Sequence, residues 1–163
     1  MTTGTHILAG VAVALYFKLP IFPAVFGSVF PDVDLKKGFP KKRTLFNSHR
    51  GITHHVAIPV ILTFMLFFFK DVIPSVIFRD VLSFSLGYAS HLLLDSLTPL
   101  GVPVGFSYRQ RFSFKLLKSG KLSEIIVALL LLIFLAGIFK KESITLESFF
   151  GRDNISFLMN MLK

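Results

Sequence analysis

Long apolar runs, separated by short polar and basic segments, constrain the fold of this chain more than any other feature of its sequence. The run at 122–139 contains a single charged residue, Glu124. Two further runs, at 52–69 and 76–97, approach or exceed the roughly 20 residues that a helix needs to cross a bilayer. Hydrophobic residues make up 53% of the chain, which is too apolar for an ordinary soluble domain. We therefore expect an all-α, polytopic membrane helical bundle with about three full spans.

Two shorter apolar pieces, 5–17 and 21–30, precede these runs, and neither alone is long enough to form a span. Lys18 and two prolines interrupt them. One possibility is a single kinked span, which would place His6 and Asp32 on opposite sides of the membrane. The other is an N-terminal helical hairpin, which would return both side chains to the same side. We favour the hairpin, because the polar residues then converge.

The 163 residues suit one integral membrane domain, 1–163. We expect 1–121 to carry the functional core, 122–139 to form the last span and 140–163 to form an interfacial tail. The net charge is +9 and there is no cysteine, so disulfides and thiolate ligands are excluded. The basic residues cluster in loops between apolar runs. This pattern indicates contact with anionic lipid, and no nucleic-acid partner is expected.

Four polar clusters carry the chemistry of the sequence. His91 and Asp95 are four residues apart, so on a helix they share one face and can form half of a zinc site. Alone, this pair is equally typical of a hydrogen bond between two buried polar groups. The other clusters supply further ligand types at His6, at Asp32 and Asp34, and at His49 and His54. Arg50, beside His49, has the planar fork that grips phosphate or carboxylate.

The distribution of basic residues predicts the orientation of the chain. Two long basic loops should be cytoplasmic by the positive-inside rule: the loop at 35–48, and the loop that follows Pro103 and carries Arg109, Arg111, Lys115, Lys118 and Lys121. This orientation places the clusters around residues 32, 49 and 91 at one membrane face, and a hairpin adds His6. For the clusters around residues 32, 49 and 91 the orientation depends on the basic residues alone, so their convergence favours a single site.

The motifs Thr5-His6, Phe30-Pro31-Asp32-Val33-Asp34, His49-Arg50-Gly51-Ile52-Thr53-His54 and Gly87 to Asp95 resemble the YdjM-like family of predicted membrane-bound metal-dependent hydrolases. The His-x-x-x-Asp helix followed by Thr-Pro is also similar, more distantly, to the zinc-dependent phospholipase C and single-strand nuclease superfamily. The resemblance implies metal ligands at His6, Asp32, Asp34, His54, His91 and Asp95, and His49 is a further candidate. The soluble enzymes carry additional ligands downstream, whereas this chain has no histidine after His91.

We therefore expect a hydrolase of a prokaryotic cytoplasmic (inner) membrane that acts on a phosphate ester, a phospholipid or lipid phosphate, at the cytoplasmic face. The cofactor is one or two divalent ions, expected to be zinc, although manganese or magnesium also fits. Asp32 and Arg50 are the candidate catalytic residues, and Arg50, Arg109 and Arg111 are the candidate substrate-binding residues. The alternative is a divalent-metal transporter or sensor that uses the same ligands without hydrolysis. A serine hydrolase is excluded, because there is no Gly-x-Ser-x-Gly motif.

Overall fold

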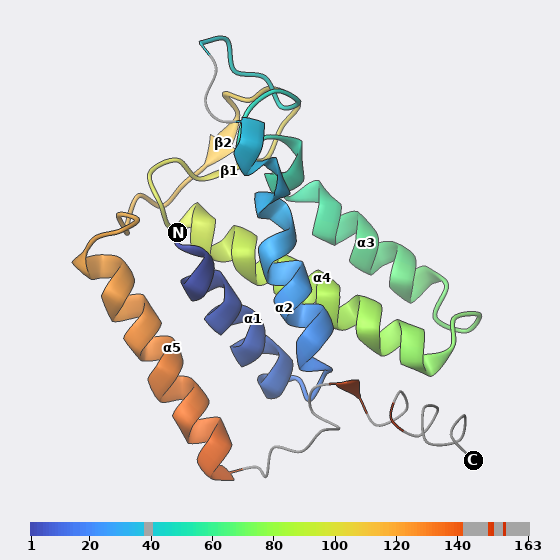
Figure 1. Ribbon diagram of the computed structural model, residues 1–163. Coiled ribbons are helices and arrows are strands. Elements are labelled where there is room, and N and C mark those ends of the chain that lie inside the picture. Colours follow the sequence, from blue (N-terminus) through green and yellow to red (C-terminus); the bar gives the residue numbers. More distant parts are fainter. Residues whose placement is uncertain (38–40, 142–149, 152–154, 156–163) are drawn as a thin grey trace.

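Helix α4 (Ser75–Ser96) lies at the centre of a mainly helical fold, and α1, α2 and α3 pack against it (Figure 1). The computed structural model describes residues 1–37, 41–141, 150, 151 and 155. The remaining elements in these ranges are α1 (Thr3–Tyr16), α2 (Ile21–Val29), the 3-10 helices η1 (Phe30–Lys37) and η2 (Ile52–His54), α3 (Ala57–Phe68), the strands β1 (Val102–Pro103) and β2 (Arg111–Phe112), and α5 (Leu122–Lys141). Helix α5 packs against α1 on the outside of the bundle.

The two N-terminal apolar pieces form the helical hairpin and not a single kinked span. Helix α1 ends at Tyr16, Lys18 turns the chain with a positive φ of 54°, and α2 begins directly after Pro20. Proline suits this position, because the first helical amides have no intrahelical acceptor to lose. Helices α1 and α2 then run side by side (Figure 1), so that His6 and Asp32 lie at the same end of the bundle.

Small residues let α2 approach α4 closely. A methyl group at Gly27 would collide with the Phe84 carbonyl of α4, and one at Gly87 would collide with the Ala24 carbonyl of α2. Close backbone approach at small residues is the usual way that membrane helices pack. The consequence is functional, because this contact brings the end of α2 and the start of η1 against His91.

The expectation of three full spans is not confirmed. The run at 52–69 divides into η2 and α3, and α3 has only 12 residues, about 18 Å of helix. Helix α4 is long enough, at 22 residues, but its many polar side chains make it less apolar than a typical span. Among the described residues, only Leu122–Lys140 is both long and apolar enough to cross a membrane.

The expected all-α fold needs a correction, and the expected C-terminal tail lies largely outside the described residues. The fold is not purely α, because β1 and β2 pair antiparallel, with Val102 opposite Phe112 and Pro103 opposite Arg111. This ribbon closes the loop that follows α4. The expected interfacial tail at 140–163 lies almost entirely outside the described residues.

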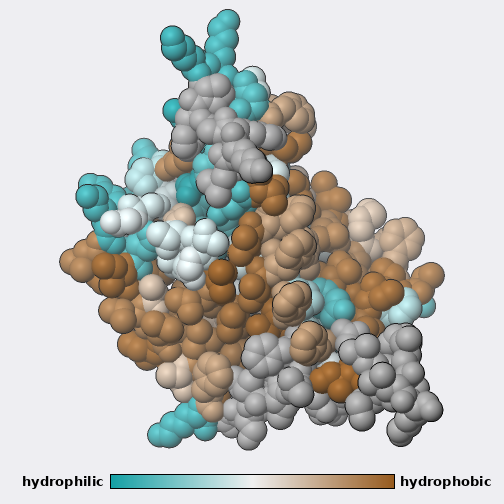
Figure 2. Space-filling model, in the orientation of Figure 1, coloured by the Kyte–Doolittle hydropathy of each residue, from teal (hydrophilic) through white to brown (hydrophobic). Residues whose placement is uncertain are grey.

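The surface separates into a polar end and an apolar body. Figure 2 shows hydrophilic residues gathered at the end that carries the loops, and hydrophobic residues over the helices below it. Large apolar side chains are exposed on α2, α3 and α5, among them Phe22, Phe26, Phe64, Phe68, Leu130 and Ile133. An outward-facing apolar surface on the helices, next to a polar end, is typical of a protein embedded in lipid.

Candidate metal centre

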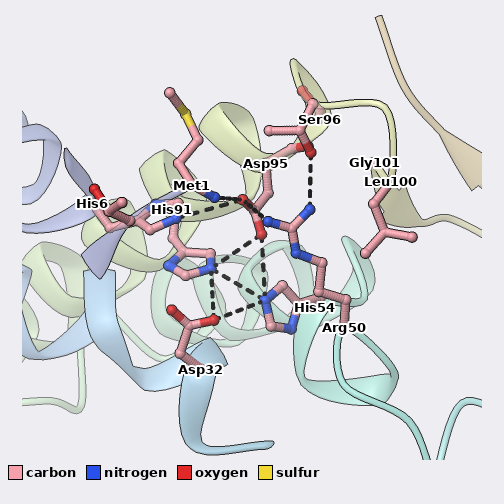
Figure 3. Close-up of polar contacts among 12 residues, drawn as sticks. Met1, His6, Asp32, Arg50, His54, His91, Asp95, Ser96, Leu100 and Gly101 are labelled. Atoms are coloured by element: carbon pink, nitrogen blue, oxygen red, sulfur yellow. Dashed lines mark hydrogen bonds and ion pairs between the residues drawn. The ribbon is translucent and has the colours of Figure 1, made fainter. Parts of the chain in front are cut away.

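Histidine and aspartate side chains from four segments meet at the polar end of the bundle. Figure 3 shows that His91 and Asp95 of α4, Asp32 of η1 and His54 of η2 point toward one another. Two overlapping triads have ligand atoms close enough to hold an ion: Asp32, His54 and His91, and His6, His91 and Asp95. The structure therefore brings together residues that are up to 89 positions apart, from His6 to Asp95.

The distances within the first triad suit a small divalent ion. The Nε2 atoms of His54 and His91 are 3.2 Å apart, and Asp32 Oδ1 lies 3.4 Å from the first and 3.7 Å from the second. Asp95 Oδ2 lies 3.5 Å from both Nε2 atoms. Two ligands on a tetrahedral zinc are roughly 3.3 Å apart, because each bond is about 2.0–2.1 Å long.

Hydrogen bonds on the far side of each ring assign the imidazole tautomers. His91 Nδ1 donates to the Ser28 carbonyl at 2.6 Å. His54 Nδ1 lies 3.3 Å from Thr53 Oγ1 and 3.5 Å from Asp34 Oδ2. A proton on each Nδ1 leaves a lone pair on each Nε2, which is the arrangement found in metal-binding histidines.

The two oxygens of Asp95 have different surroundings. Oδ1 accepts hydrogen bonds from Arg50 at 2.6 Å and from the Met1 ammonium at 2.8 Å. Oδ2 is buried, has no hydrogen-bond donor among the described residues and faces His54 and His91. Electron-pair donors that face one another in a buried space repel unless a cation lies between them. The donor set therefore fits a divalent ion.

His6 completes the second triad, and its ring is held by stacking and not by a hydrogen bond from any described residue. Its ring stacks on His91, with 3.7 Å between centroids, and its Nε2 lies 3.5 Å from Asp95 Oδ1. Both ring nitrogens are buried and lack a hydrogen-bond partner in the described part of the chain. Because His91 belongs to both triads and its Nδ1 is engaged by Ser28, its Nε2 can serve only one ion at a time.

Asp34 and His49 lie behind the triads. Asp34 Oδ1 is 2.6 Å from His49 Nδ1, and Oδ2 accepts hydrogen bonds from Thr53 at 2.5 Å and from the Gly51 amide at 3.3 Å. Burial opposes ionisation, but the hydrogen bonds from His49, His54 and Thr53 hold the pKa of Asp34 well below its usual value. The sequence suggested that Asp34 binds an ion, whereas in the structure Asp34 accepts hydrogen bonds from protein groups. Through its contact with Nδ1, Asp34 orients His54.

The carboxylates also act on the charge of His54. Burial lowers the pKa of this imidazole, but Asp32 and Asp34 outweigh burial and raise the pKa above its usual value. Burial also opposes ionisation of Asp32, but the hydrogen bond from His54 and the charges of His91 and His54 outweigh it and lower the pKa of Asp32. The centre therefore favours a positive charge at this point, which a proton or a metal ion can supply.

The candidate substrate-binding arginines occupy different environments. Arg50, with a positive φ of 56°, donates to Asp95 and also to Thr98 Oγ1 at 2.9 Å. Arg111 donates to the carbonyls of Leu100, Gly101 and Arg50 and stabilises the loop after α4. Arg109 is exposed and lines a basic groove of about 700 Å³ with Lys41, Lys42, Arg43, Leu100, Tyr108 and Arg111.

Several residues that support the centre were not identified from the sequence. Ser28 orients His91 through its carbonyl, and no side-chain pattern reveals such a role. Tyr88 donates to the Thr53 carbonyl and so ties η2 to α4. Thr98 could have been identified, because it belongs to the Thr-Pro pair that follows the His-x-x-x-Asp motif. In the structure its hydroxyl accepts a hydrogen bond from Arg50.

The fold and the centre together define a class: a helical membrane protein with a buried His/Asp site at the polar end of its bundle. Residues 1–151 match the family described as the YdjM inner membrane protein. Inner membrane protein YdjM of Escherichia coli (strain K12) is 30% identical over 148 residues, which covers 77% of this chain and 75% of that protein. Inner membrane protein YdjM of Shigella flexneri matches to the same extent.

The chain therefore belongs to the YdjM inner membrane protein family, as the motifs indicated, and it is an inner membrane protein. No solved structure matches it. The names of the relatives describe a location and no activity, so the function is inferred from the site.

Proposed function

We propose that this protein is a metal-dependent hydrolase of the inner membrane that cleaves the phosphate ester of a lipid at the cytoplasmic face. The observation that carries the proposal is the set of facing donor atoms on Asp32, His54, His91 and Asp95, which lie 3.2–3.7 Å apart in the pairs given above. A divalent ion in such a site supplies an activated water and stabilises charge on phosphoryl oxygens.

Access to the centre supports a substrate at the membrane surface. The side chain of Asp32 is 12% exposed, whereas those of His6, His54, His91 and Asp95 are exposed by 1% or less. Two apolar residues near Asp32 in η1 are exposed, Val33 at 60% and Phe30 at 37%. An opening beside exposed apolar side chains suits a lipid better than a water-soluble phosphate ester.

The residues around the centre would have different roles in such a reaction. Asp32 lies at the exposed side, where a substrate would arrive, and it both binds the ion and faces the reacting group. Arg50 holds Oδ1 of Asp95 and so aims Oδ2 into the centre. The exposed cations Lys41, Lys42 and Arg109 form a basic groove that suits an anionic headgroup.

The test is metal content and phosphoesterase activity of the protein in lipid nanodiscs. The parent should retain about one divalent ion per chain and hydrolyse a phospholipid, a lipid phosphate or a model phosphodiester. Asp32→Asn should lower turnover about 100-fold or more, because the substitution removes the charge of a ligand at almost constant size. Asp71→Asn, in the exposed turn between α3 and α4, is the matched control and should leave turnover unchanged.

A second candidate, a divalent-metal sensor or transporter, is favoured by the near-complete burial of His6, His54, His91 and Asp95. Binding of metal by the parent with no hydrolysis of any of the three substrates would reject the hydrolase and favour this second function. Uptake of zinc into sealed vesicles would then distinguish a transporter from a sensor.

A further inference from the structure

Glu124 is a buried carboxylate at the start of the most lipid-like helix of the protein. It is the third residue of α5 and is only 4% exposed, although most of α5 is open to its surroundings. The apolar run around it contains no other charge. A buried carboxylate in such a place needs hydrogen bonds that offset the loss of water.

The hydrogen bonds come from the beginnings of two helices. Glu124 Oε1 accepts from the Thr2 amide at 2.5 Å, Thr2 Oγ1 at 2.8 Å and Thr5 Oγ1 at 2.9 Å. Glu124 Oε2 accepts from the Gly120 amide at 2.6 Å. Thr2 is the N-cap of α1, and Gly120 precedes α5. Because both helices direct the positive ends of their dipoles at this carboxylate, it caps both at once.

His6 depends on this arrangement more than the other histidines do. His91 is oriented by the Ser28 carbonyl and His54 by Asp34, whereas neither ring nitrogen of His6 has a hydrogen-bond partner among the described residues. His6 directly follows Thr5, whose hydroxyl Glu124 holds. The first turn of α1 therefore sets the position of His6 over His91.

We propose that Glu124 is a positioning residue of the metal centre, and that it places His6 by fixing the first turn of α1 against α5. This role depends on the proposed function at one point, which is that His6 helps to hold the ion. It makes α5 part of the site as well as a membrane span.

The metal test uses the full chain in nanodiscs with zinc, measured by competition with a chelating dye. Glu124→Ala should weaken zinc binding about 10-fold, as expected for a residue that orients a ligand, and His6→Ala should weaken it at least as much. The double variant should bind no more weakly than His6→Ala alone, because the two residues act through one ligand. Glu124→Gln should recover part of the loss, since its amide oxygen still accepts hydrogen bonds. Ser123→Ala is the control, because among the described residues the Ser123 hydroxyl bonds to Lys118 and to no part of α1.

A second measurement needs no metal. Diethyl pyrocarbonate modifies accessible histidines, and mass spectrometry identifies which of them react. In the parent both His6 and His54 should be protected, and Glu124→Ala should expose His6 while His54 stays protected. Continued protection of His6, or simultaneous exposure of His6 and His54, would overturn the positioning role. If the parent binds no zinc, the proposed function fails, and the modification pattern alone decides the role of Glu124.

Discussion

Helices α4 and α5 have similar lengths and opposite surroundings. Helix α5 has 20 residues, and its apolar stretch has a mean hydropathy of 2.8 with only 11% of the stretch buried. Helix α4 has 22 residues, and most of its buried positions hold small or polar side chains: Ser83, Ser85, Gly87, Ser90, His91, Asp95 and Ser96 among them. A length that fits the bilayer therefore does not separate a lipid-facing helix from one that carries a site.

The difference follows from the neighbours of each helix. Three helices surround α4 and give its polar groups partners, such as the Pro20 carbonyl for Ser83 at 2.5 Å and the Thr63 hydroxyl for Ser85 at 2.6 Å. Helix α5 packs mainly against α1. Most of its side chains therefore face outward, where an unpaired polar group would be costly in lipid.

The largest effect should come from adding a methyl group to α4. Gly87→Ala places a Cβ against the Ala24 carbonyl, so α2 must shift away from α4. We expect a loss of stability of about 3 kcal/mol or more, together with loss of bound metal, because the shift moves Ser28 and Asp32 away from His91. Gly137→Ala in α5 is the matched control, because beyond the adjacent backbone of α5 no atom of the described residues lies within 4 Å of its added Cβ. Thermal unfolding in detergent measures both, and equal stability of the two variants would contradict the close α2–α4 contact.

A charge in the middle of α5 should have the next largest effect. Leu130 is 60% exposed, and Leu130→Arg should disfavour insertion of α5 by about 3 kcal/mol. The same substitution at Leu116, an exposed leucine in the loop before α5, should leave insertion unchanged. The fraction of α5 that inserts, measured with a glycosylation reporter, distinguishes the two. Full insertion of Leu130→Arg would mean that this face of α5 does not contact lipid.

The smallest effect should come from removing one hydroxyl from α4. Ser83→Ala deletes the buried hydrogen bond to the Pro20 carbonyl and should cost about 1 kcal/mol of unfolding free energy. Ser123→Ala at the start of α5 should change stability by less than about 0.5 kcal/mol, because its contacts are exposed. Denaturant unfolding in mixed micelles gives both values. A smaller loss for Ser83 than for Ser123 would show that the hydroxyls of α4 do not stabilise the bundle.

The sequence determined those features that depend on local spacing. The four-residue spacing of His91 and Asp95 puts both side chains on one face of α4 in any packing, and the Lys18–Pro20 segment breaks the first apolar stretch into two helices. The motifs also identified the family, and the clusters around residues 6, 32, 54 and 91 were singled out as one site. The spacing and the helix break hold because the geometry of a helix relates near neighbours without any tertiary contact, whereas the four clusters meet only through contacts between separate elements.

Tertiary structure alone decided which partner each charged group found. Asp32 and Asp34 are two residues apart and similar in sequence, yet Asp32 faces His54 and His91 while Asp34 is bound by His49 and Thr53. Arg50 donates a hydrogen bond to Asp95, and Glu124 accepts one from Thr5, which lies 119 positions earlier in the chain. Tertiary structure also determined the length of α3. The first residues of the apolar run at 52–69 form η2, which brings His54 to the centre, and only 12 residues remain in α3. A long-range ion pair or hydrogen bond depends on which helices lie in contact, and neither spacing nor composition encodes that.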